Sequence, residues 1–468
     1  MPAARVVIAL KLCALVALVT AAVLWPAPAG GPGGGVAHAQ WHTLARTFLN
    51  PTPAADDNFG RSVAALGGNV LVGAPNDDTG ASSAGAAYLF DGASGAFLRT
   101  FLNPTPAVED YFGASVAAVG DNVLVGAHLD DTGATNAGAA YLFDATTGVL
   151  LQTFLNPMPA TSDAFGSSVA AVGGNVLVGA PFDHTGALRA GAAYLFDATS
   201  GVLLQTFLNP TPAVSDLFGV SVAPLGGNVL VGAHNDNTGA TNAGAAYLFD
   251  ASTSALLRTF LNPNPADDDD FGVSVAGLGG NVLVGAYLDD AGATDAGAAY
   301  LFDAASGGLL DTFLNPTPAT GDWFGISVAA LGSNVLVGAP GNLASGEAGT
   351  AYLFDAANAA LLETFLNPTA AAGDQFGWSV AAVGGNVLVG AYLDDAGATD
   401  AGAAYLFEAP AVGGVAELPA AAQTPRLDGG SGSSGPGAGV LAGLAAAGAA
   451  AIVLGGAAWW TRRRDRES

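Results

Sequence analysis

The sequence contains almost no cysteine, no more than one lysine and few positive charges. Its single cysteine, Cys13, lies in an apolar stretch near the N-terminus, so no disulfide can hold the remainder together and stability must come from packing. Residues 41–409 contain 35 acidic residues and 5 Arg, a net charge of −30. Such a segment repels nucleic acid and attracts cations or basic surfaces, which argues against a nucleic-acid partner.

Signatures of catalysis are also missing. No Gly-x-Ser-x-Gly pattern occurs, and no Cys or Glu cluster accompanies the histidines of the acidic segment. His128 and His234 occupy one loop position in different repeats, and His184 lies three residues further along its own loop. We interpret these histidines as polar loop residues, the alternative being a shared central metal. We therefore predict that the protein is not an enzyme and requires no cofactor.

The N-terminal residues 1–39 have the composition of a secretory signal peptide. Arg5 and Lys11 form a basic start, an apolar run covers 12–25, and Ala37-His38-Ala39 provides small residues for cleavage before Gln40. The predicted mature protein is therefore exported.

The C-terminal residues have the composition of a membrane anchor. Residues 410–437 are rich in Pro, Gly, Ser and Ala, which predicts a flexible stalk. Residues 438–460 carry no charge and predict a transmembrane helix, and the Arg-rich residues 461–468 predict a cytoplasmic tail. The expected location is the cell surface, with residues 40–409 outside; the alternative is a C-terminal sorting signal that is processed.

A Phe-Leu-Asn-Pro segment recurs seven times between these ends. The spacing is 53 residues five times and then 52, which is typical of one propeller blade per repeat. The segments begin at Phe48, Phe101, Phe154, Phe207, Phe260, Phe313 and Phe365.

Each repeat contains four short strand-like runs, here named A to D. In the first repeat they cover 62–66, 70–74, 85–91 and 96–102, with Gly-rich turns after A and C and a long polar loop after B. The last repeat stops after its C run, whereas a spare D run at 44–49 precedes the first repeat. We therefore predict an all-β, seven-bladed propeller of four-stranded blades over residues 40–409, closed by an N-terminal strand that completes the last blade.

The repeats resemble a known family. The run Asp57-Asn58-Phe59-Gly60, followed by Gly73-Ala74-Pro75, is similar to an FG-GAP repeat, and the resemblance covers all seven units over residues 44–407. The family includes the N-terminal propeller of integrin α chains, which implies extracellular interaction more than catalysis. Integrin-type blades often carry an Asp-rich calcium loop between runs A and B. In this sequence the turn between runs A and B contains only Gly67-Gly68-Asn69 or its equivalents. The resemblance therefore does not imply calcium binding between these runs.

Every repeat has an Asp two positions before the Phe-Gly pair and a Ser three positions after the Phe. We interpret the Asp as accepting hydrogen bonds from the Phe-Gly turn amides, and the Ser as closing the same turn. The alternative is a ligand or metal contact repeated seven times. The turn residues are Asp57, Phe59, Gly60, Asp110, Phe112, Gly113, Asp163, Phe165, Gly166, Asp216, Phe218, Gly219, Asp269, Phe271, Gly272, Asp322, Phe324, Gly325, Asp374, Phe376 and Gly377.

A second acidic set lies in the loops between runs B and C. It comprises Asp77, Asp78, Asp130, Asp131, Asp183, Asp236, Asp289, Asp290, Asp394 and Asp395, and the sixth repeat lacks it. We interpret these carboxylates as solvated turn residues. Because paired carboxylates beside Gly can bind calcium, weak calcium binding is the alternative. Because the runs alternate in direction, the B–C and D–A loops should share one face, which we call the loop face.

We predict a binding or adhesion module whose loop face meets an extracellular protein or glycan. Two alternatives stay open. One is a structural surface-coat protein, and the other is a surface enzyme such as a glycan hydrolase, which would need more than one loop to differ from its siblings.

Overall fold

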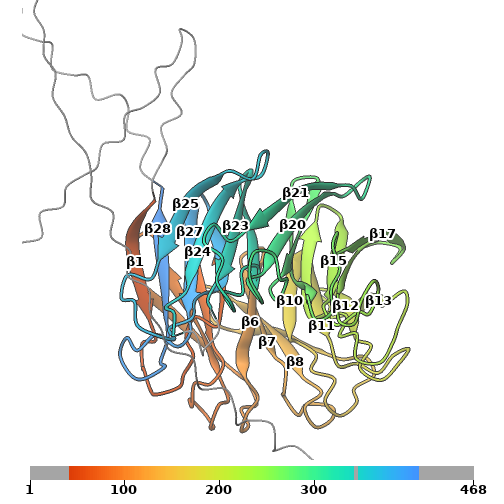
Figure 1. Cartoon of the computed structure of the whole chain (residues 1–468). Coiled ribbons are helices and arrows are strands. Elements are labelled where there is room, and N and C mark those ends of the chain that lie inside the picture. Colours follow the sequence, from red (N-terminus) through yellow and green to blue (C-terminus); the bar gives the residue numbers. More distant parts are fainter. Residues whose placement is uncertain (1–41, 342–345, 410–468) are drawn as a thin grey trace, which may run out of the picture. The chain divides into compact units, whose positions relative to one another are not determined.

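The described part of the chain folds into 28 strands because each repeat supplies four short apolar runs. The computed structural model describes residues 42–341 and 346–409, and within these ranges all regular elements are strands. They form seven four-stranded antiparallel sheets, as predicted. Figure 1 shows the sheets arranged around a ring, with β1 beside β28.

The blades have these bounds. Blades 1 and 2 contain β2 (Ser62–Leu66), β3 (Asn69–Ala74), β4 (Ala86–Asp91), β5 (Phe97–Leu102), β6 (Phe112–Val119), β7 (Asn122–Ala127), β8 (Ala139–Asp144) and β9 (Leu150–Leu155). Blades 3 and 4 contain β10 (Ser168–Val172), β11 (Asn175–Ala180), β12 (Ala192–Asp197), β13 (Leu203–Leu208), β14 (Ser221–Leu225), β15 (Asn228–Ala233), β16 (Ala245–Asp250) and β17 (Leu256–Leu261). Blades 5 and 6 contain β18 (Phe271–Leu278), β19 (Asn281–Ala286), β20 (Ala298–Asp303), β21 (Leu309–Leu314), β22 (Ser327–Leu331), β23 (Asn334–Ala339), β24 (Thr350–Asp355) and β25 (Leu361–Leu366). Blade 7 contains β26 (Phe376–Val383), β27 (Asn386–Ala391), β28 (Ala403–Glu408) and β1 (Thr43–Leu49).

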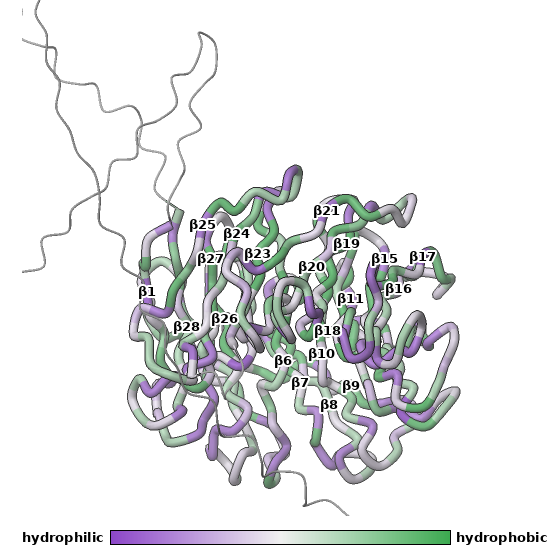
Figure 2. The backbone as a smooth tube through the Cα atoms, viewed as in Figure 1, coloured by the Kyte–Doolittle hydropathy of each residue, from purple (hydrophilic) through white to green (hydrophobic). Residues whose placement is uncertain are grey.

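The hydrophobic core lies between neighbouring blades. One cluster joins Leu71 and Leu89 of blade 1 to Val123, Val125 and Tyr141 of blade 2. The second strand of every blade reads Asn-Val-Leu-Val-Gly-Ala, and its last five residues are buried in all seven copies. These strands are covered on both faces, which explains why they are apolar throughout. Figure 2 shows apolar residues following the strands and hydrophilic residues in the loops.

The first strand of each blade lines the centre of the ring. Strand β2 contacts its counterparts β6 and β26, and the same contacts continue from blade to blade around the ring. The turn that follows β2 is tight: Leu66 pairs with Asn69, and Gly67 adopts a φ of 59°. Glycine suits this turn because a positive φ costs it little.

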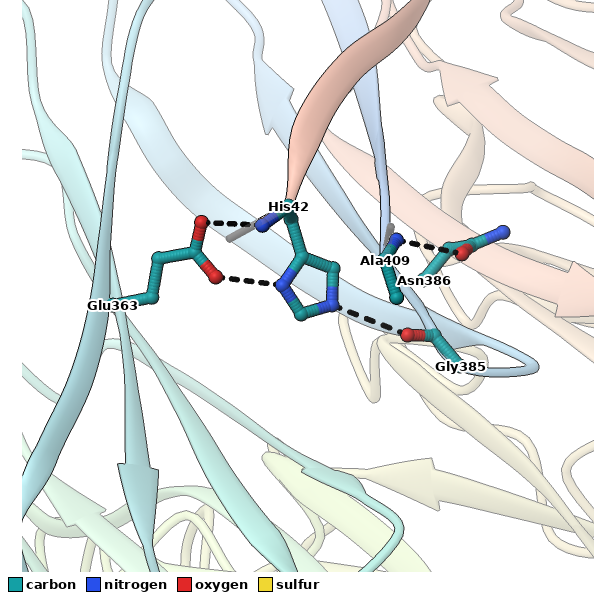
Figure 3. Close-up of polar contacts among 5 residues, drawn as sticks. All are labelled: His42, Glu363, Gly385, Asn386 and Ala409. Atoms are coloured by element: carbon teal, nitrogen blue, oxygen red, sulfur yellow. Dashed lines mark hydrogen bonds and ion pairs between the residues drawn. The ribbon is translucent and has the colours of Figure 1, made fainter. Parts of the chain in front are cut away.

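The ring is closed by β1, as predicted. Strand β1 pairs antiparallel with β28, from Thr43 opposite Glu408 to Leu49 opposite Ala403. Just before β1, the His42 backbone nitrogen donates to Glu363 Oε1 (2.7 Å), and the ring Nδ1 lies 2.6 Å from Glu363 Oε2 (Figure 3). The closing strand is therefore tied to blade 6 as well as to its own sheet.

The predicted signal peptide (1–39), stalk (410–437), transmembrane helix (438–460) and basic tail (461–468) lie outside the described residues. In the part of the chain that the structure covers, no helix has the length and apolarity needed to span a membrane.

Candidate functional site

The loop face is built from D–A and B–C loops that interlock between neighbouring blades. The Glu109 nitrogen of blade 2 donates to the Ser82 carbonyl of blade 1 (2.9 Å), and the Phe112 nitrogen donates to the Ala84 carbonyl (3.0 Å). Equivalent bonds cross the closing junction, where the Phe59 nitrogen donates to the Ala401 carbonyl (2.9 Å). The long loops therefore share one face, as the alternation of strands predicts, and they are fixed by backbone hydrogen bonds.

A buried side-chain network lies beneath this face in each blade. In blade 2, Asn103 Nδ2 donates to Asp110 Oδ2 (2.8 Å) and to Asp130 Oδ2 (3.0 Å). The Tyr141 hydroxyl donates to the same Asp130 oxygen (2.6 Å). The network ties the D–A loop, the B–C loop and the third strand together. In the sixth blade Asn315 and Asp322 keep their bond, but no Asp stands at the second position.

The network divides the ten predicted B–C loop carboxylates into two groups. Six are buried, with exposed fractions of 2–7%: Asp77, Asp130, Asp183, Asp236, Asp289 and Asp394. Four are exposed and accept a backbone amide five residues further on: Asp78, Asp131, Asp290 and Asp395. A binding role for the set stays a prediction. Only the second group presents its carboxylates to solvent.

The Phe-Gly turns connect blades, and our interpretation of their polar partners was wrong. Asp57 accepts from the Ala54 nitrogen (2.6 Å) and from Asn50, not from the Phe-Gly amides. The Ser62 hydroxyl donates to the Gly113 carbonyl of the next blade (2.8 Å) rather than closing its own turn. The Phe-Gly amides instead form backbone bonds, from Phe59 to blade 7 and from Gly60 to the Gly73 carbonyl (3.0 Å). The spacing along one repeat does not reveal a partner in another.

The buried Asp of each Phe-Gly turn is a weaker acid than usual. Burial raises the pKa of Asp57 from 3.8 to about 6, opposed by the Ala54 hydrogen bond and reinforced by the neighbouring Asp77 charge. The pKa values of Asp110, Asp269 and Asp374 rise to about 6 mainly through the same burial. Two close carboxylates in one buried network favour the protonated form of one of them.

A pocket of about 500 Å³ opens on the loop face at the end of the central strands. It is lined by residues of blades 7, 1, 2 and 3, among them Arg61, Tyr111, His128, Ser167 and Tyr392. The Arg61 guanidinium carbon lies 4.2 Å from the centroid of the Trp378 ring and 5.0 Å from that of Tyr392. The Tyr111 and His128 rings stack at 5.6 Å with an interplanar angle of 18°.

Apart from Asn76, the residues that line the pocket come from three positions of the repeat at which the blades differ, which we call the axial positions. They are the residue before the Phe, the residue after its Gly, and the residue after the second strand. The first position holds Asn58, Tyr111, Ala164, Leu217, Asp270, Trp323 and Gln375; the second holds Arg61, Ala114, Ser167, Val220, Val273, Ile326 and Trp378; the third holds Pro75, His128, Pro181, His234, Tyr287, Pro340 and Tyr392. These positions were not predicted from the sequence, although their variation beside identical strands is visible in it.

The histidines do not form a metal centre in the part of the chain that is described. Within residues 42–341 and 346–409, no group of three or more His, Cys, Asp or Glu side chains could hold a metal ion. His184 Nδ1 accepts from the Arg189 nitrogen (3.2 Å). His128 and His234 each have a buried Nδ1 without a partner, and burial lowers the pKa of both rings to about 4. Both rings are therefore neutral at pH 7.

The seven sheets define a seven-bladed β-propeller with a pocket on its loop face. The family model for the FG-GAP repeat matches seven times, over residues 50–90, 105–143, 159–196, 210–249, 259–302, 316–354 and 365–407. The protein therefore belongs to the FG-GAP repeat family, and its seven repeats fit a propeller like the N-terminal one of integrin α chains. Such propellers are typically extracellular binding or structural modules. No curated protein matches the chain.

Proposed function

We propose that the protein is an extracellular adhesion module, anchored at the cell surface, whose ligand meets the loop face at the axial positions. One observation carries this proposal. The seven second strands are identical, whereas the residue that follows each of them varies from Pro to His to Tyr. A ring kept only for its stability has no need of such variation at one place. Side chains that differ on a rigid scaffold are typical of recognition.

Backbone strain at the first axial position supports the same conclusion. All seven residues there adopt positive φ values, including Tyr111 at 53°, Leu217 at 58° and Trp323 at 56°. A bulky residue in this conformation is destabilising, and glycine would remove the strain. None of the seven repeats has glycine at this position. The side chains are therefore retained at a cost in stability, as expected for residues that contact a ligand.

Glycan and protein arrays probed with the full-length protein test the proposal. We expect a restricted set of ligands whose binding is weakened by Tyr111→Ala, which removes an aromatic ring of the loop-face pocket. The matched control is Phe97→Ala, which removes an aromatic ring that is 48% exposed at the start of β5, away from the loop face. A protein that binds nothing on either array, or whose binding falls equally in the two variants, would contradict the proposal.

Surface anchoring is tested by topology. The uncharged residues 438–460 and the Arg residues after them motivate the expectation that protease added to intact cells cuts within 410–437 and releases the propeller. Protection of the propeller until the membrane is broken would show the proposed orientation to be wrong. Propeller found in the medium without added protease would favour a processed C-terminal signal.

A further inference from the structure

The pocket contains a cation that has no anionic partner. Among the described residues, the Arg61 guanidinium forms no salt bridge and no hydrogen bond, and it lies against the rings of Trp378 and Tyr392. It is the only positively charged side chain at the axial positions. A partly buried cation lined by aromatic rings is strongly attractive to an anion, because little water competes for it.

The other arginines of the propeller have different surroundings. Arg46, Arg99 and Arg258 lie on the fourth strands and donate to backbone carbonyls of the next blade, such as Thr147 for Arg99 (2.9 Å). Arg189 lies over the Phe182 ring at 5.4 Å. Arg61 is thus the one arginine placed in the pocket.

A second polar group of the pocket also has no partner. His128 Nδ1 is buried without a hydrogen bond, although the His128 ring is fixed by stacking on Tyr111. Because this nitrogen is buried, His128 contributes to the wall of the pocket through its stacked ring and not through Nδ1. Asn58, Asn76 and Ser167 add amide and hydroxyl groups to the same wall.

We propose that this pocket binds a singly charged carboxylated sugar, with its carboxylate on Arg61. This inference rests on the proposed function. The planar guanidinium can hold a carboxylate through two parallel hydrogen bonds. Tyr111 and Tyr392 line the pocket beside Arg61 and add apolar surface for a sugar ring, and the amide and hydroxyl groups supply partners for its hydroxyls. The volume of about 500 Å³ lies within the range of small-molecule sites, roughly 300–1,000 Å³.

The negative charge of the ring disfavours ligands that carry several negative charges. Residues 41–409 carry a net charge of −30, so a phosphate or a polyanionic glycan is repelled over the whole approach. Arg61 neutralises one charge only. Asp270 is the only carboxylate at the axial positions; it lies in blade 5 and does not line the pocket.

Titration calorimetry on the full-length protein tests the proposal. The probes are an oligosaccharide ending in glucuronic acid and the same oligosaccharide ending in glucose. We expect the glucuronyl form to bind about tenfold more tightly or better, the effect of one charged hydrogen-bonded pair. Arg61→Met, which retains an apolar stem beside the aromatic rings, should reduce its affinity to that of the glucosyl form. Arg258→Met is the matched control and should change neither affinity, and thermal melts check that both variants fold.

The possible results separate this inference from the proposed function. Equal binding of the two sugars, or a preference that survives Arg61→Met, overturns the carboxylate assignment. An Asp-containing hexapeptide that binds through Arg61 while the glucuronyl sugar does not overturns the sugar assignment. Array ligands lost in Tyr111→Ala but retained in Arg61→Met would overturn this inference and leave the binding module itself supported.

Discussion

At the scale of single residues, one amide holds two carboxylates under the loop face. Asn103→Ala removes the Nδ2 donor that Asp110 and Asp130 share and leaves both buried acids less satisfied. We expect the free energy of unfolding to fall by about 1–3 kcal/mol, the usual cost of a buried polar group left without its partner. Denaturant unfolding measures this change. Asp131→Asn on the exposed neighbour should alter it by less than about 0.5 kcal/mol, and equal effects of the two substitutions would show that the network is not the cause.

The same carboxylates make stability depend on pH. Because burial raises the pKa of Asp57 from 3.8 to about 6, the folded state binds more protons than the unfolded state between these pH values. Stability is therefore greatest below about pH 4 for this group and decreases as the pH rises through about 6. We expect the melting temperature to fall between pH 4.5 and 7, and Asp110→Asn to flatten the profile. A melting temperature that rises over this interval would contradict the assignment.

The sequence predicted which residues form the turns better than it predicted the hydrogen-bond partners of those residues. The Phe-Gly motif marked each turn, and all seven Phe side chains are fully buried. Yet Ser62 bonds to Gly113, and Asn103 bonds to Asp130, across 51 and 27 residues. Such contacts are decided by how the blades pack, which no local spacing shows. Arg61 was overlooked because its neighbours in space, Trp378 and Tyr392, belong to the last blade.

At the scale of elements, β1 decides whether the ring is closed. Deleting residues 42–49 would expose the edge of β28 and remove the contact of His42 with Glu363. We expect a loss of several kcal/mol in unfolding free energy, the order expected for removing a strand with buried apolar side chains. Denaturant unfolding measures this loss, and His42→Ala is a milder control that keeps the strand. If the deletion left the free energy of unfolding unchanged, β1 would not stabilise the closed ring.

The strands themselves were largely predictable because their apolar pattern is strong. In the first repeat the expected runs 62–66, 70–74 and 96–102 agree with β2, β3 and β5 to within one residue. The first strand of blades 2, 5 and 7 begins earlier, at the Phe of the motif, through a register shift such as that between Phe112 and Ser115. A β-bulge of this kind depends on pairing with the neighbouring strand, so the sequence of the bulged strand alone does not predict it.

At the scale of the whole molecule, acidity predicts how ions act on stability. A net charge of −30 on one rigid ring is self-repelling, and cations relieve this repulsion. We expect calcium and magnesium to raise the melting temperature by similar amounts. Sodium at higher ionic strength should have the same effect. A specific oxygen site would instead favour calcium, since magnesium needs a tighter octahedral shell. A large shift with calcium alone, removed by Asp131→Asn, would show that the exposed loop carboxylates form such a site.

The closing strand also has a consequence for biosynthesis. Thr43 pairs with Glu408, so the first strand to leave the ribosome is the last to find its partner. Until the final repeat has been made, the growing protein has an unpaired strand at its beginning and an open sheet edge at its end. A chain truncated by premature termination keeps both features permanently. Complete and incomplete molecules therefore differ in a property that chaperones and proteases recognise, which is an exposed strand edge.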